Sequence, residues 1–257
     1  ARRMVDAISE AGFNMLLIGV SDGIVYSSHP EFTRHYSQPP EKLTELAEYA
    51  RSRGLSVAPK LNFSESEVNC HSHWMRAPGE QWHTHFDDEY YWQAAFECID
   101  EVIDLCGPDE FFHVGMDEDH NRSYTQFVEA LRKLEAGIRS RGLRTLSWSD
   151  SGLDYASGQI YREKSEKAER EIDTDLVRVL WNYWAVPEDA ARTIREQKLG
   201  LWCAPGRDDP AQIAAFRDLG KEVGAEGILM TNWRIANADN EGEMLEVIRT
   251  MGPLYNE

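Results

Sequence analysis

Residues 111–120, FFHVGMDEDH, run from an apolar stretch directly into three consecutive acids, Asp117, Glu118 and Asp119. Two neighbouring carboxyl groups can divide the work of breaking a glycosidic bond. One, when protonated, donates a proton to the leaving oxygen, and the other stabilises what forms on the opposite side. Like charges close together also raise the pKa of one member, which suits a proton donor. Most acidic triplets are solvated, so the elements around this one decide its meaning.

Asp117 and Glu118 can serve one site only if the chain leaves the extended conformation just before them. Successive side chains of a regular strand point to opposite faces, so a strand that continued would separate the two carboxyl groups. Gly115 and the run of acids predict that the buried strand at 111–116 breaks into its loop at this point.

Strand-like and helix-like segments alternate along the chain. Helical spacing of apolar residues ends on Gly12, Gly54 and Gly142, which suit left-handed helix ends. Helices are expected in the segments that close on Gly12 and Gly54, at 124–140 in front of Gly142, and at 88–106, 187–197, after Asp209-Pro210 and at 241–251. Residues 156–173 form a polar stretch. Buried strands are predicted near 14–20, 55–62, 111–116, 144–149, 177–182, 199–204 and 227–233.

Strands joined by helices, without hairpin signals, predict a parallel sheet with helical crossovers. We therefore expect an α/β fold, a TIM-type (β/α)8 barrel that forms one domain over residues 1–257. Such a barrel has eight strands, so its first strand is expected to be missing or to lie upstream of Ala1. A doubly wound open sheet is the alternative, but the sequence lacks the glycine-rich phosphate turn that it usually carries after an early strand.

The predicted strands end in polar and aromatic residues. Barrel enzymes build their sites at these carboxyl ends. Indole rings beside acids and amides suit a sugar, whose flat apolar face stacks on the ring while fixed polar groups bind its hydroxyls. These strand ends hold Ser21 and Asp22; Asn62 to Ser64; Asp117, Glu118 and Asp119; Trp148 and Asp150; Asn182, Tyr183 and Trp184; Trp202 and Cys203; and Asn232, Trp233 and Asn237.

Composition narrows the class of partner. The net charge of −18 argues against nucleic acid and against an anionic membrane surface, both of which need basic patches, and is compatible with a neutral or cationic small substrate, so a carbohydrate partner is allowed. The four cysteines show no metal-binding spacing and are expected to be buried free thiols. No signal peptide or spanning segment is visible. A cytoplasmic location is favoured, a cleaved leader and a homodimer stay open, and no cofactor is expected.

The sequence resembles the β-N-acetylhexosaminidases of glycoside hydrolase family 20. HVGMDE at 113–118 is similar to their H-x-G-x-D-E motif, which ends the fourth barrel strand of that family. Further segments resemble the family in the same order along nearly the whole chain: EAGFNMLLIGVSD its second strand, LAEYARSRGLSVAPKL the helix and third strand, LSWSD its fifth strand and GILMTNW its eighth.

The resemblance implies a role for individual residues. Glu118 would be the general acid/base, and Asp117 would orient the substrate's 2-acetamido group, whose carbonyl oxygen acts as the nucleophile in a retaining, exo-acting hydrolysis. His113 would support the site by hydrogen bonding, beside Asp119. The remaining substrate-binding residues would be Asp22, His71, His73, Trp148, Trp181, Tyr183, Trp202 and Trp233.

The sequence departs from the family at the far edge of the sugar. The first strand of the family, which ends in an Arg that grips the outer hydroxyls, is absent from this sequence. Two residues beyond Trp233 the family presents an acid, whereas this chain has Ile235. The third strand reads PKLNF in place of an acidic pair. A divergent branch with altered recognition of the outer hydroxyls is therefore expected.

Two other classes of function stay open. Metal-dependent barrel hydrolases use H-x-H pairs, and the loop at 63–87 carries two such pairs, His71/His73 and His83/His85. No histidine follows His120, however, so later strands offer only carboxylates as further ligands. A non-catalytic carbohydrate-binding barrel is the other alternative, because the ligands for the outer hydroxyls are altered.

Overall fold

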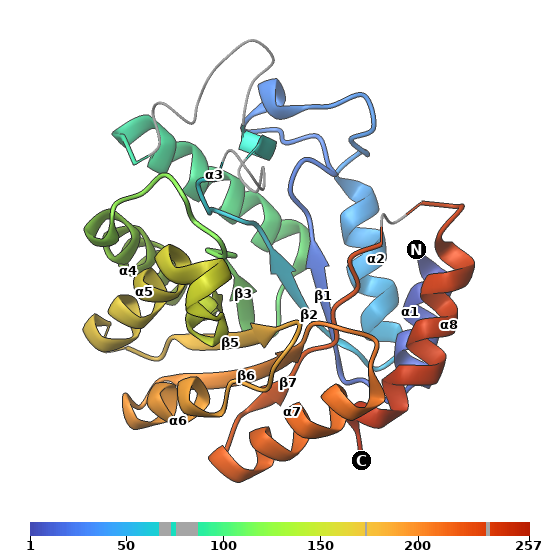
Figure 1. Cartoon of the computed structure of the whole chain (residues 1–257). Helices are drawn as coiled ribbons and strands as arrows, with labels where there is room; N and C mark the ends of the chain where they lie inside the picture. Colours follow the sequence, from blue (N-terminus) through green and yellow to red (C-terminus); the bar gives the residue numbers. More distant parts are fainter. Residues whose placement is uncertain (67–72, 76–86, 173, 235–236) are drawn as a thin grey trace.

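The computed structural model describes residues 1–66, 73–75, 87–172, 174–234 and 237–257. Its centre is one sheet of seven parallel strands in the order of the sequence, each paired with the next (Figure 1). All seven predicted strands are confirmed. Their bounds are Met15–Gly19 (β1), Ser56–Lys60 (β2), Phe111–His113 (β3), Arg144–Ser149 (β4), Val177–Asn182 (β5), Gly200–Pro205 (β6) and Gly227–Ile228 (β7).

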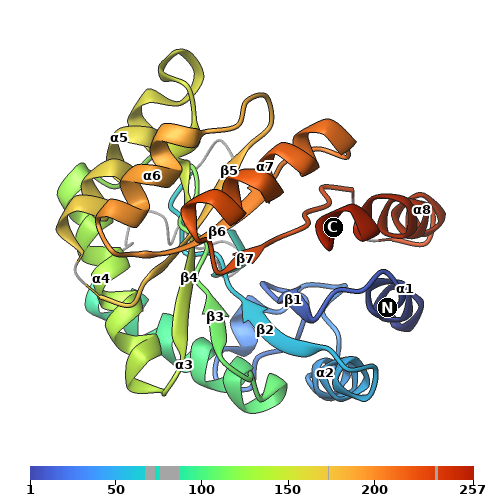
Figure 2. The ribbon, with the colours of Figure 1, turned by 90° about the horizontal axis from the view of Figure 1, so that it is seen from below.

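Helices connect the strands and cover the outer face of the sheet (Figure 2). Local sequence sets several of their starts: Asp88 accepts a hydrogen bond from the Tyr91 N–H, Ser123 and Gln126 form a capping box, and Asp209 caps a helix that opens on proline. The α-helices are Arg2–Glu10 (α1), Glu41–Ser52 (α2), Glu89–Cys106 (α3), Tyr124–Ser140 (α4), Tyr155–Glu171 (α5), Glu188–Glu196 (α6), Pro210–Val223 (α7) and Glu241–Met251 (α8). The 3-10 turns are Pro30–Phe32, His73–Met75, Asp150–Gly152 and Gly252–Tyr255.

The sheet curls into a partial barrel that is open between β7 and β1 (Figure 2). Within the described residues these two strands each have a single partner strand, so the closed eight-stranded barrel expected from the sequence is present only in part. On the outside of this opening α1 packs directly against α8, with Ala7 and Ala11 buried against Leu245 and Ile248.

Alternating side chains divide the sheet into an inner and an outer face. On β5, Val179 and Trp181 belong to the inner cluster, and Leu180 belongs to the outer one, which the helices cover. The buried inner cluster is small and rich in aromatic residues: Ala58, Phe111, Leu146, Trp148, Val177, Val179, Trp181, Trp202 and Ala204.

β3 is shorter than the predicted segment 111–116, and the reason lies in its backbone. Gly115, Met116 and Glu118 have φ values of +72°, +71° and +50°, so the chain is no longer extended after His113. This is the break that the sequence predicts in front of the acids. β7 is also shorter than expected, since only Gly227 and Ile228 continue the ladder with β6.

Helix α5 occupies the segment that the sequence shows only as a polar stretch. Its inward face is polar because the sheet beneath it is polar as well. Arg178 on β5 is fully buried, forms an ion pair with Glu169 at 3.3 Å and donates to the hydroxyls of Ser147 and Ser165. A helix held by buried polar contacts lacks the apolar stripe by which amphipathic helices are recognised.

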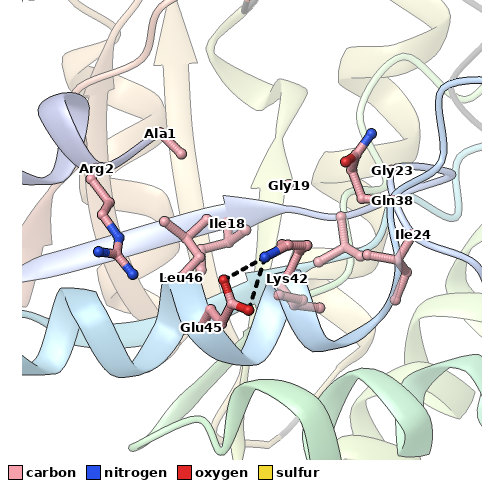
Figure 3. A pocket seen from close by; sticks show the side chains of 12 residues that line it. Ala1, Arg2, Ile18, Gly19, Gly23, Ile24, Gln38, Lys42, Glu45 and Leu46 are labelled. Atoms are coloured by element: carbon pink, nitrogen blue, oxygen red, sulfur yellow. Dashed lines mark hydrogen bonds and ion pairs between the residues drawn. The ribbon is translucent and has the colours of Figure 1, made fainter.

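A groove of about 370 Å³ lies beside the open edge of the barrel, between β1, the loop after it and the start of α2 (Figure 3). Its walls include Ile18, Ile24 and Leu46, and Lys42 and Glu45 form an ion pair at 2.8 Å on its rim. It contains none of the predicted site residues.

Two expectations from composition can be compared with the coordinates. Cys98, Cys106 and Cys203 are buried free thiols as expected, and Cys70 lies outside the described residues. No helix in the part of the chain that the structure describes is long and apolar enough to cross a bilayer.

Candidate active site

A pocket of about 210 Å³ opens at the carboxyl ends of the strands, where β3, β4, β5, β6 and β7 meet. It brings together six residues predicted from the sequence, two acids and four aromatic residues. Its lining is Asp117, Glu118, Trp148, Trp181, Tyr183, Ala204, Gly206, Thr231 and Trp233.

Asp117 is held by a network at the end of β2. The Asn62 side-chain amide donates to Asp117 Oδ1 at 2.7 Å, and Asn62 Oδ1 accepts from the backbone N–H of Met116 and from Ser64. The Ser64 hydroxyl also donates to the Asp117 carbonyl oxygen. Asn62 approaches so closely because Gly115 has no side chain: a Cβ there would lie 2.7 Å from the Asn62 Cα. Asp117 is therefore buried and fixed in orientation.

Glu118 is half-buried and is positioned through its backbone. Its N–H donates to Asp150 Oδ2 at 2.7 Å, and the indole N–H of Trp181 donates to Asp150 Oδ1 at 2.9 Å. Asp150 itself is 1% exposed and begins the turn after β4. One buried carboxylate thus contacts both the loop of the acids and an aromatic wall of the pocket.

The acids of the site influence one another. Burial, followed by the charge of Asp117, raises the pKa of Asp150 to about 7, although the hydrogen bonds from Glu118 and Trp181 favour its charged form. Burial together with the charges of Glu118, Asp117 and Asp150 raises the pKa of Tyr183 to about 12. Tyr183 therefore carries its hydroxyl proton at neutral pH and can act as a hydrogen-bond donor in the pocket.

His113 lies beneath the pocket and supports the break in β3. Its Nδ1 accepts from the Gly115 N–H at 2.9 Å, and its ring packs against Trp148 with the ring centroids 4.8 Å apart. Burial and the nearby charges of Lys60 and Arg178 hold the pKa of His113 well below its usual range. The ring is therefore neutral with its proton on Nε2, which suits a structural role.

Asp119, the third acid, faces a different environment. Its carboxylate accepts from the Glu65 N–H and forms buried ion pairs with Arg122 at 2.7 Å and Lys164 at 3.2 Å. Arg122 also forms an ion pair with Asp87, which precedes α3. Asp119 does not line the pocket; it fastens the acid-bearing loop to α5 and to the chain after β2.

The aromatic residues form the wall of the pocket. Tyr183 lies edge-on to Trp181 at 5.0 Å and to Trp233 at 6.5 Å between ring centroids. Trp148 and Trp181 are buried, whereas Trp233 is 58% exposed at the mouth. Such a wall offers flat apolar faces beside the two carboxyl groups, as the sequence predicts for a sugar site.

Other predicted site residues lie elsewhere. Asp22 accepts from the Tyr36 hydroxyl at 2.7 Å and does not line the pocket. Trp202 packs against Phe111 in the inner cluster, at 5.2 Å between ring centroids, and does not line the pocket either. His71 and the side chain of His73 lie outside the described residues.

The alternative metal site cannot be placed on the described chain. His83 and His85 also lie outside the described residues. Within the residues that the structure does describe, no three histidine, cysteine or acidic side chains are grouped so as to hold a metal ion.

Sequence reasoning did not assign a role to Asn62 or Asp150. Both stand among the polar strand ends, which is the signal that marks them. Their roles depend on contacts with Asp117 and Glu118 across neighbouring strands, and residue spacing does not predict which strand-end side chains will touch.

Fold and pocket together define the class: a partial parallel α/β barrel whose carboxyl-end pocket holds two acids within an aromatic wall. No family model and no curated protein matches the sequence. Solved structures do match the fold, and the matches include glycoside hydrolase family 20 enzymes, which confirms the resemblance of the fold to that family.

The similarity to two of these structures extends over nearly the whole chain. A mutant Streptomyces plicatus β-hexosaminidase in complex with product (GlcNAc) has a TM-score of 0.69 at 14% identity, with 99% of this chain and 60% of that chain covered. The Flavobacterium johnsoniae chitobiase has a TM-score of 0.65 at 13% identity, covering 99% and 45%. A family 20 β-N-acetylglucosaminidase has a TM-score of 0.55 at 18% identity, covering 80% and 50%. This chain thus spans about half the length of these proteins.

Proposed function

We propose that this protein is a glycoside hydrolase that removes terminal 2-acetamido sugars by a retaining, substrate-assisted mechanism. One observation carries the proposal: Asp117 and Glu118 line the same aromatic-walled pocket, although they are neighbours in sequence. The likeness to family 20 structures supports it at the level of the fold.

Glu118 is the general acid and base in this mechanism. Its carboxyl group donates a proton to the glycosidic oxygen as the bond from that oxygen to C1 of the sugar breaks. After the aglycone leaves, the same carboxylate takes a proton from the water that attacks C1, and the bond that the acetamido oxygen has formed to C1 breaks, which restores the acetamido group. The half-buried position of Glu118 at the pocket suits a group that must meet both substrate and water.

Asp117 orients the nucleophile, which belongs to the substrate. Its carboxylate accepts a hydrogen bond from the acetamido N–H, so that the acetamido carbonyl oxygen faces C1 and attacks it as the leaving group departs. The contact from Asn62 fixes the Asp117 carboxylate for this task. Trp148, Trp181 and Trp233 enclose the acetyl group and the sugar face, and the Tyr183 hydroxyl is the proposed donor to the acetamido oxygen.

A panel of 4-nitrophenyl glycosides with and without a 2-acetamido group tests this function. We expect release of nitrophenol from 2-acetamido sugars only, and loss of turnover with retained sugar binding in Glu118→Gln. Asp117→Asn is expected to lower kcat on these 2-acetamido substrates. Cleavage of plain glucosides or galactosides alone would contradict the role of Asp117.

The same assays separate the rival functions. If no glycoside is cleaved but sugars bind, the protein is a carbohydrate-binding barrel. If stoichiometric zinc or manganese is found in protein purified without a histidine tag, the metal-dependent hydrolase is supported, and the roles proposed for Asp117 and Glu118 are not. No contact among the described residues favours either alternative over the acid pair.

The complete architecture is also a proposal. We propose that residues 1–257 belong to one catalytic domain, a (β/α)8 barrel whose first strand, missing or upstream of Ala1, would lie along the free edge of β1, next to the groove of Figure 3. A structure of a longer chain in which another segment pairs with the free edge of β1 would support this arrangement, and one in which that edge stays unpaired would contradict it. A homodimer is tested by light scattering at several concentrations.

A further inference from the structure

Asp150 is buried at the carboxyl end of β4, and no step of the proposed chemistry uses it. Its carboxylate oxygens accept from the Glu118 N–H at 2.7 Å and from the Trp181 indole N–H at 2.9 Å. Its own N–H donates to the Ser165 hydroxyl of α5 at 3.0 Å. A single residue therefore joins the loop of the acid and one wall of the pocket through its carboxylate, and a helix on the outer face through its backbone N–H.

Both side-chain partners of Asp150 are donors, so each oxygen has to accept. Only the ionised carboxylate can do this, because a protonated acid or an amide presents hydrogen to one of the two N–H groups. The Glu118 backbone in addition has a φ of +50°, a conformation that residues other than glycine adopt rarely and that persists where the surroundings hold it.

We propose that Asp150 is a positioning residue that locks the backbone of Glu118 and the indole of Trp181 into one unit, and so sets where the acid stands relative to the aromatic wall. The inference rests on the proposed function for its effect on turnover. The lock itself rests on the two hydrogen bonds and can be tested without any substrate.

Five titratable groups face Asp150 from the elements around it: Asp117 and Glu118 from the loop after β3, Tyr161 and Lys164 from α5, and Tyr183 from the end of β5. Of these five, only Lys164 is a cation. Burial and the charge of Asp117 raise the pKa of Asp150 to about 7. The lock is therefore complete above pH 7 and loses one acceptor below it.

The test compares Asp150→Asn, Trp181→Phe and the double variant. In Asp150→Asn, the amide NH2 must face either the Glu118 N–H or the Trp181 N–H, so we expect kcat to fall about tenfold or more. Trp181→Phe keeps an aromatic ring but removes one donor, and the amide can then turn towards it. We therefore expect the Asp150→Asn substitution to cost markedly less in the Trp181→Phe background. Asp189→Asn, an exposed acid of α6, is the control.

The results separate the lock from a merely structural role. The fall should lie in kcat rather than in KM, and the wild-type decline in kcat as pH falls through about 7 should be absent in Asp150→Asn. Full kcat in Asp150→Asn, or losses in the double variant that equal the product of the two single losses, would overturn the inference.

Stability measurements keep the two proposals apart. If the wild-type protein cleaves no 2-acetamido glycoside, the proposed function fails, and the lock is then judged from the midpoints of urea unfolding at pH 8 by the same comparison. Should Asp150→Asn not fold, a folded double variant supports the lock. Failure of both to fold, with Trp181→Phe folded, counts against it.

Discussion

Gly115→Ala tests whether the break in β3 positions Asp117. An added methyl group would lie 2.7 Å from the Asn62 Cα, about 0.8 Å closer than the ~3.5 Å at which carbon atoms make favourable contact. Because that atom belongs to the backbone, the loop or the end of β2 has to move by a comparable amount. Asn62 donates to Asp117 Oδ1 at 2.7 Å, so the movement reaches the carboxylate.

Two effects of Gly115→Ala can be separated by size. The φ of +72° costs an L-residue about 1–2 kcal/mol of folding free energy. Displacement of Asp117 by close to 1 Å is expected to lower kcat/KM on a 2-acetamido aryl glycoside by about 100-fold. Gly142→Ala is a matched control, since Gly142 has a φ of +78° and no atom of the described residues lies within 4 Å of its missing Cβ.

Urea unfolding and initial-rate kinetics on both variants provide the measurements. We expect both alanine variants to lose stability, Gly115→Ala by more, and only Gly115→Ala to lose activity. A Gly115→Ala protein as active and as stable as Gly142→Ala would refute the argument, because it would show that Asn62 can move without disturbing Asp117.

Three further predictions concern single side chains: one buried ion pair, one exposed indole and one buried carboxyl group. Arg122→Met removes the closer of the two cations on the buried carboxylate of Asp119 and leaves it with Lys164, so we expect the fold to be destabilised by about 3 kcal/mol in urea unfolding, whereas the exposed Arg132→Met should change little. Trp233→Ala is expected to raise KM several-fold with an unchanged midpoint of thermal unfolding, since this indole is 58% exposed. The folded-state pKa of Asp150 is about 7, which lies above the usual value of about 3.9. Its contribution to stability is therefore fully present below the lower value and is lost as pH rises through the higher one. In urea unfolding, the unfolding free energy of Asp150→Asn minus that of wild type should accordingly rise from pH 5 to pH 8.

The order of the elements could be predicted because each strand is a short apolar run and most helices carry an apolar stripe. The strands at 144–149 and 177–182 were predicted with the bounds that the structure has. α5 could not be predicted, since Glu169 and Ser165 on its inner side are polar and find their partner, Arg178, on a strand that comes later in the chain.

The candidate site was predictable in its residue types and only partly in its contacts. The acids after a glycine, together with the tryptophans and the tyrosine at strand ends, led to the six predicted residues that line the pocket. The sequence cannot tell that Trp202 packs against Phe111 inside the barrel, because Trp148 has the same strand-end context and lines the pocket. The pairing of Asn62 with Asp117 depends on how closely two backbones approach, which residue type alone does not reveal.

The buried ion pair between Lys164 and Asp119 moors the acid-bearing loop to a helix 45 residues further along the chain. Substitutions on that helix can therefore displace the loop that carries Asp117 and Glu118 without altering any side chain that lines the pocket. Libraries of variants confined to the residues that line the pocket would overlook this distant contact. A homologue that keeps every pocket residue but has lost the ion pair between Lys164 and Asp119 is expected to be inactive.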